Sequence, residues 1–104
     1  MLFPFTFNRY NRYETTGYRE WAKAVKLKCK YTCYICGKFS KNVHAHHIEN
    51  YNKKSKKNIA IKNGVCLCPE HHYNFHLKYG FSRNNRQQLE EFKKSYQASR
   101  TSSD

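Results

Sequence analysis

The cysteines and histidines of this chain are confined to residues 29–76, which hold all five cysteines and all six histidines. Cys33 and Cys36 are separated by two residues, and Cys68 and His71 repeat that spacing. Such a spacing lets both side chains of a pair reach one ion, and three thiolates with one imidazole suit tetrahedral zinc. Four buried core residues would be the simpler interpretation, but the doubled spacing argues against it. We therefore predict a closed structural Zn2+ site.

The histidines around the second pair indicate a further site. A proline and a glycine predict a helix over residues 69–79. On this helix His72 and His76 stand four residues apart and share one face, whereas His71 lies about 100° around the axis. His71 can therefore face the zinc site while His72 and His76 face a second metal.

The charge of the chain indicates a polyanionic partner. Twenty lysines and arginines against seven acidic residues leave a net charge of +13. This excess fits nucleic acid better than a merely solubilising surface, because an unpartnered surface of one charge repels itself. Five lysines lie between the histidine pair and the second cysteine pair, where they either contact phosphates or belong to a solvated loop: Lys53, Lys54, Lys56, Lys57 and Lys62.

Several classes of protein are disfavoured by composition. The chain has no uninterrupted apolar run of about eighteen residues and no signal-peptide pattern, so we expect an intracellular, cytoplasmic protein without a membrane partner. Reducing conditions there favour metal-bound cysteines over disulfides. Seven acidic residues are too few for a metal site built from several carboxylates. The sequence has no glycine-rich phosphate loop, so we expect no small-molecule cofactor.

The elements that must position these residues follow from the hydrophobic pattern. Apolar residues from Tyr18 to Cys29 recur at helical spacing, residues 42–48 and 64–68 are typical of short strands, and a last helix begins at Asn84 or Asn85. The expected fold is a small α+β domain with flanking N- and C-terminal helices. We expect an aromatic, basic arm at 1–16, which stacks on bases or packs on the body, one domain at 17–98, and a disordered tail at 99–104.

The order and spacing of these motifs resemble the HNH endonucleases, in particular phage- and intron-associated homing enzymes. The resemblance rests on Cys33-x2-Cys36, Ala45-His46-His47-Ile48, Asn63-Gly64-Val65-x-Leu67-Cys68 and His71-His72. It implies a ββα-metal core, two strands followed by a helix, stapled by the zinc site. Two positions depart from the pattern: Cys29 stands where relatives often carry an acid, and His71 replaces the usual fourth cysteine.

The resemblance also implies a role for each residue. His47 is expected to be the general base, and Asn63 to brace the loop and orient that base. His46 and His72 are expected to bind a catalytic divalent metal, Mg2+, Mn2+ or Ni2+, with His76 as a third ligand or a phosphate contact. The implied function is a metal-dependent DNA endonuclease that hydrolyses phosphodiester bonds. The alternative is a zinc-stabilised nucleic-acid-binding module that does not cut.

Two further expectations concern the histidine strand. Adjacent residues of a regular strand face opposite sides, so His46 and His47 should lie at a strand end or a twist if they serve one site. We interpret His44, two residues before His46, as a surface or zinc-side residue rather than a member of the site. The oligomeric state, the recognised DNA sequence and the choice between nicking and double-strand cleavage are open at this stage.

Overall fold

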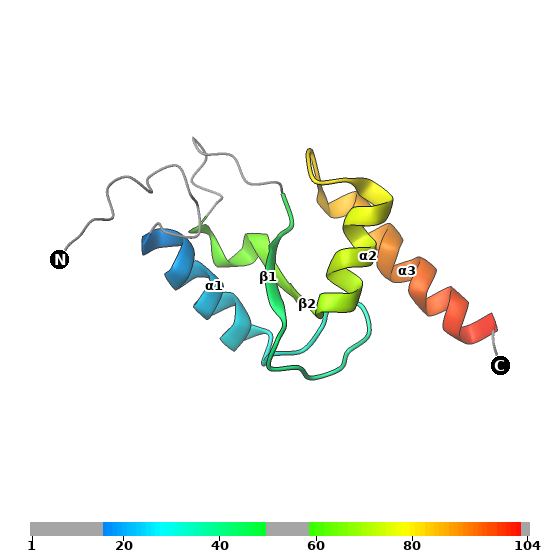
Figure 1. Ribbon diagram of the computed structural model, residues 1–104, viewed down its shortest axis with the longest axis horizontal. Helices are drawn as coiled ribbons and strands as arrows, with labels where there is room; N and C mark the ends of the chain where they lie inside the picture. The colour runs from blue at the N-terminus through cyan, green and yellow to red at the C-terminus, as the bar shows by residue number, and fades with distance from the viewer. Residues whose placement is uncertain (1–15, 50–58, 103–104) are drawn as a thin grey trace.

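The computed structural model describes residues 16–49 and 59–102. In these ranges the chain forms three α-helices, a two-stranded antiparallel sheet and a short 3-10 helix (Figure 1). The elements are α1 Thr16–Lys28, β1 His44–His47, η4 Ile61–Asn63, β2 Gly64–Leu67, α2 Pro69–Tyr79 and α3 Arg86–Ser102. The predicted α+β class and both flanking helices are confirmed. Residues 1–15 of the expected arm, and Lys53, Lys54, Lys56 and Lys57, lie outside the described residues.

The two strands divide the molecule into two hydrophobic clusters. Their register pairs His44 with Leu67, Ala45 with Cys66, His46 with Val65 and His47 with Gly64. Successive side chains of a strand alternate between faces. Ala45 and Cys66 accordingly pack with α1, whereas Val65 and Leu67 pack with α2 and α3. The sheet thus lies between α1 on one side and α2 on the other, with α3 beyond α2 (Figure 1).

Helix α1 contacts the sheet closely because of one glycine. Trp21 and Val25 are buried on its apolar stripe, as the helical spacing predicts. A Cβ atom on Gly64 would lie 2.5 Å from Val25 Cγ2 and 2.8 Å from Trp21 Cζ2. Such distances are shorter than van der Waals contact, so only glycine permits this approach between helix and strand.

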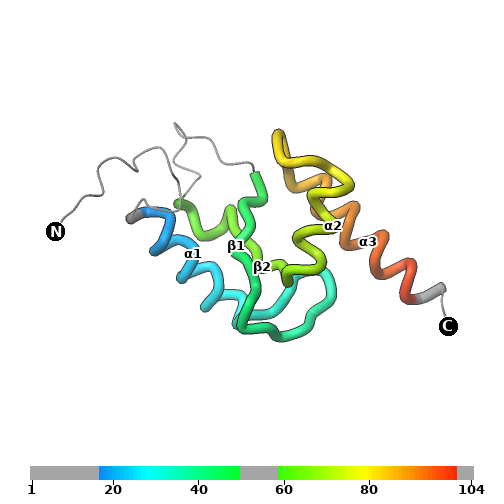
Figure 2. Tube along the Cα trace, viewed as in Figure 1, coloured from blue at the N-terminus to red at the C-terminus, as the bar shows by residue number. Residues whose placement is uncertain are grey.

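The strands are shorter than predicted. Asn42 donates its backbone N–H to Ser40 Oγ at 3.0 Å, and Val43 donates its own to Ser40 O at 3.4 Å. These turn contacts occupy the backbone groups that a longer β1 would use for the sheet. The connection from α1 to β1 curves past the start of α2 (Figure 2), and Tyr34 N–H donates to Cys66 O at 2.8 Å.

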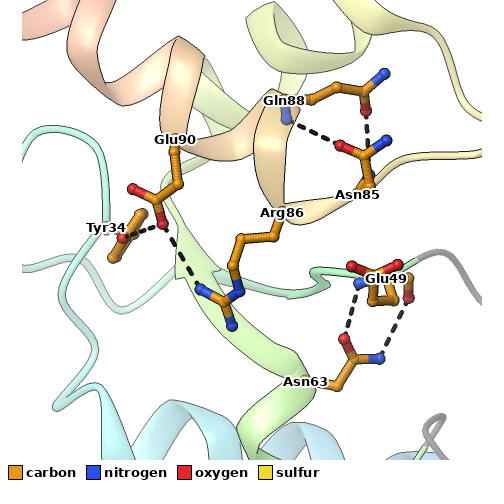
Figure 3. A network of polar contacts seen from close by, with 7 residues as sticks. All are labelled: Tyr34, Glu49, Asn63, Asn85, Arg86, Gln88 and Glu90. Atoms are coloured by element: carbon orange, nitrogen blue, oxygen red, sulfur yellow. Dashed lines mark hydrogen bonds and ion pairs between the residues drawn. The ribbon is translucent and has the colours of Figure 1, made fainter.

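The C-terminal helix begins where the sequence predicts and ends later. Asn85 Oδ1 accepts from Gln88 N–H at 3.0 Å, and Gln88 Oε1 accepts from Asn85 N–H at 3.2 Å (Figure 3). This reciprocal pair forms the N-cap. Helix α3 continues to Ser102, so residues 99–102 of the expected tail are helical. Extending a formed helix gains one hydrogen bond per residue, and Arg100 also reaches back to Tyr96 Oη at 3.3 Å.

The length and apolar character of the helices decide whether any of them could span a membrane. Within residues 16–49 and 59–102, none is both long enough and apolar enough to cross a bilayer.

Candidate metal centres

The first group of potential ligands joins the two cysteine-containing pairs. The ligand atoms of Cys33, Cys36, Cys68 and His71 all lie within 4.8 Å of one another. His71 Nδ1 is 3.2 Å from Cys68 Sγ and 3.9 Å from Cys33 Sγ. The predicted Cys3His group therefore exists as a geometry that could hold a metal ion.

Each cysteine pair is shaped by a local turn. Gly37, with φ at 73°, lies in the left-handed region that glycine favours, and its N–H donates to Cys33 O at 2.8 Å. On the other side, Cys68 is the N-cap of α2, and its Sγ accepts from His71 N–H at 3.5 Å. Ile35 N–H points at Cys33 Sγ in the same way, at 3.4 Å. Backbone N–H groups directed at sulfur stabilise the thiolate form that binds a metal.

The electrostatics of the group favour a cation. Burial raises the pKa of the Cys33 thiol, but backbone donors at Cys36, Cys68 and Ile35 outweigh burial and leave the pKa below its ordinary value. Burial raises the pKa of Cys68 to about 11, with a smaller increase from the neighbouring Cys33. Neighbouring thiolates repel one another. A dication would relieve this repulsion by replacing the protons of the thiols.

Helix α3 covers this group. The His71 ring is 4.8 Å from the Tyr96 ring and 6.3 Å from the Phe92 ring, both in edge-to-face geometry. Tyr34, which lies between Cys33 and Cys36 in the sequence, donates its Oη–H to Glu90 at 2.7 Å (Figure 3). Cys33 is 1% exposed. Cys36 and Cys68 are half-buried, so α3 covers the His71 side of the Cys3His group rather than the whole of it.

The second group consists of three histidines on the opposite side of α2 from His71. The ligand atoms of His46, His72 and His76 lie within 4.8 Å of one another, and the Nε2 atoms of His72 and His76 are 3.2 Å apart. His76 donates its Nδ1–H to Gly80 O at 2.7 Å if its Nε2 is kept free for an ion. His46 is buried, whereas His72 and His76 are half-buried. This group could also hold a metal ion, and His76 belongs to it.

His47 does not join these three histidines. As the last residue of β1 it faces α1, where its ring stacks on Trp21 with centroids 3.9 Å apart and planes 6° apart. The Trp21 indole N–H is itself held by Ala60 O at 2.8 Å. The adjacent histidines thus lie at a strand end, as expected, but strand alternation sends their side chains to opposite faces of the sheet.

Asn63 connects the two ends of the segment between the strands. Its Oδ1 accepts from Glu49 N–H at 2.7 Å, and its Nδ2 donates to Glu49 O at 3.2 Å (Figure 3). Its own carbonyl accepts from Ile48 N–H at 2.9 Å. These bonds hold the chain directly after His47 and agree with the bracing role that the resemblance implies. Lys62, in η4 beside Asn63, is exposed.

Two neighbours of the histidine group were not expected. His44 is exposed, in line with a surface residue, but it lies beside His72 rather than on the zinc side, with its Nδ1 2.7 Å from His72 Nδ1. The alternation of the strand was the available signal, since His44 and His46 share a face. Phe81, 78% exposed, stacks on His76 with centroids 4.4 Å apart. Phe81 lies after the end of α2, so helical periodicity could not predict the position of its side chain.

Comparisons of the chain with protein-family models, with curated proteins and with solved structures find no match.

Proposed function

We propose that this protein is a metal-dependent DNA endonuclease of the HNH type, with a ββα-metal core stapled by structural Zn2+. The observation that carries the proposal is the convergence of His46, from a strand, with His72 and His76, from the helix after the next strand. Asn63, the middle residue of the motif, braces the chain that follows His47. A binding module has no need for this combination.

The donor sets support two different metals. Three thiolates and an imidazole, with N–H groups directed at two sulfurs, suit Zn2+ at the Cys3His group. Three imidazoles suit a borderline divalent ion, so Mn2+ or Ni2+ should serve at least as well as Mg2+. When bound, that ion supplies charge stabilisation for the leaving 3'-oxygen.

The residues of the chain divide the remaining work. His47 takes the proton from the water that attacks phosphorus, a task suited to an imidazole at neutral pH. Trp21 holds the His47 ring by stacking, and Ala60 holds Trp21. In-line displacement has its attacking and leaving oxygens on opposite sides of phosphorus. A base and a metal group on opposite faces of one strand end suit a phosphate that lies across that end.

Nucleic acid is the partner that the charge supports. The net charge of +13 favours contact with phosphates, and each neutralised contact steepens log K against log salt by roughly 0.9. A variant with all five loop lysines changed to glutamine should show a flatter salt slope and weaker binding on unrelated duplexes. An unchanged slope would move the contacts elsewhere on the chain. The lysines are Lys53, Lys54, Lys56, Lys57 and Lys62.

A non-cutting module stabilised by zinc is the alternative, because the net charge of +13 and the Cys3His group would serve such a module equally well. Supercoiled-plasmid nicking discriminates between the two functions. Zinc-loaded protein should nick in Mg2+, Mn2+ or Ni2+, and His72→Ala should abolish nicking while one equivalent of zinc remains in native mass spectra. Zinc-loaded wild-type protein that binds plasmid but never nicks it would establish the module instead.

A further inference from the structure

We propose that His44 is a positioning residue for the three-histidine group: its Nδ1 accepts a hydrogen bond from His72 Nδ1–H and directs His72 Nε2 toward the ion. This inference rests on the proposed function, because it requires that His46, His72 and His76 bind a metal.

Each nitrogen of His72 lies close to a nitrogen of another histidine. Its Nδ1 is 2.7 Å from His44 Nδ1, and its Nε2 is 3.2 Å from His76 Nε2. The rings of His44 and His72 meet edge to face, with centroids 4.9 Å apart. The other helix ligand shows the same arrangement, since His76 Nδ1 bonds to Gly80 O at 2.7 Å. Each helix ligand therefore keeps one nitrogen in the group and has the other held by a neighbour.

The chemistry of a metal-bound imidazole sets the direction of the bond. A histidine that binds an ion through Nε2 carries its proton on Nδ1, so this nitrogen donates and its partner must accept. His44 accepts only in its neutral form, with its proton on Nε2. Carboxylates and backbone carbonyls are the usual partners of metal-bound histidines. A neutral imidazole in that place fixes the ring without adding negative charge to the site.

The fold explains why His44 reaches His72. His44 and His46 stand two residues apart on β1, and alternation turns both toward α2. His44 is nonetheless exposed, whereas His46 is buried. His46 thus lies at the inner edge of the group and His44 at its outer edge. The His72 ring contacts both of them.

Two substitutions separate positioning from general packing. His44→Val introduces a residue that favours strands but removes the acceptor, and His44→Asn places a carbonyl oxygen close to the position of Nδ1. Zinc-loaded proteins would be titrated with Ni2+ by calorimetry. We expect His44→Val to weaken binding of the second metal roughly 10- to 100-fold, and His44→Asn to restore most of that loss. Asn42→Ala, also at an exposed site just before the strand, should bind Ni2+ like the wild type.

A second readout follows plasmid nicking against Ni2+ concentration. His44→Val should need more Ni2+ for half-maximal nicking, yet approach the wild-type rate at saturation, because His44 does not touch the reacting atoms. Equal Ni2+ affinity in wild type and His44→Val would overturn the inference while the proposed function stands. The inference would also be overturned if His44→Asn bound Ni2+ no more tightly than His44→Val. A wild-type protein that binds zinc but no second metal would overturn the proposed function, and this inference with it.

Discussion

The two candidate metal groups share helix α2 but differ in the side chains that pack against them. His71 faces the Cys3His group, which the aromatic side chains of α3 cover, whereas His72 and His76 face the other way and are half-buried. Residues about 100° apart on a helix point to different surroundings, so adjacent histidines can serve separate ions. A cover of packed aromatic rings suits an ion that holds the fold, which is the role proposed for the Cys3His group.

Breaking the Cys3His group should have the largest effect. Cys33→Ser or Cys68→Ser, or removal of zinc by a strong chelator, should abolish the cooperative thermal melt, because structural zinc contributes about 10 kcal/mol or more and small domains are stable by less than roughly 15 kcal/mol. Circular dichroism during heating is the measurement. Cys29→Ser, outside the group, is the control and should still melt cooperatively. A normal melt after verified zinc removal would contradict the structural role.

Removing the proposed general base should greatly slow nicking without unfolding the protein. His47→Ala should lower the nicking rate roughly 10²- to 10⁴-fold, since it removes proton transfer from the attacking water. Zinc content and DNA affinity should stay at wild-type values, as gel-shift titration and mass spectrometry can establish. Nicking by this variant at the wild-type rate would remove His47 from the mechanism.

A matched pair of aromatic substitutions sharpens the comparison of the two groups. Tyr96→Ala removes the ring against His71 and should lower the free energy of unfolding by about 1–2 kcal/mol, with faster zinc loss to a chelator. Phe81→Ala removes the exposed ring on His76 and should change stability by less than about 0.5 kcal/mol. Urea unfolding measures both. Equal destabilisation would mean that Tyr96 and Phe81 stabilise the two groups to the same extent.

The cap of α3 should have a smaller effect than Tyr96. Asn85→Ala removes the acceptor for Gln88 N–H and should lower the free energy of unfolding by about 1 kcal/mol. Because Phe92 and Tyr96 of α3 pack on His71 of the Cys3His group, Ni2+ affinity at the three histidines should not change. A loss of Ni2+ affinity would show that the two groups are coupled through α2.

Local patterns determined much of this protein. The two-residue spacing of the cysteine pairs, the shared helix face of His72 and His76, and the Asn85 cap each depend on a few neighbouring residues. Their geometry follows from the pitch of a helix or the reach of one turn, so they could be predicted. The length of α3 could not, because its last turn adds to a helix already formed and held by Tyr34 and Glu90.

Only the tertiary structure decided which neighbour each strand histidine meets. Alternation predicts that His46 and His47 diverge, but it does not say that α1 presents Trp21 to His47, or that α2 presents His72 to His44. Those contacts join segments far apart in the chain. They depend on Gly64, which lets α1 approach the sheet, and on the packing of α2 against the opposite face. Packing between distant segments is a collective result of the whole core, and no local spacing encodes it.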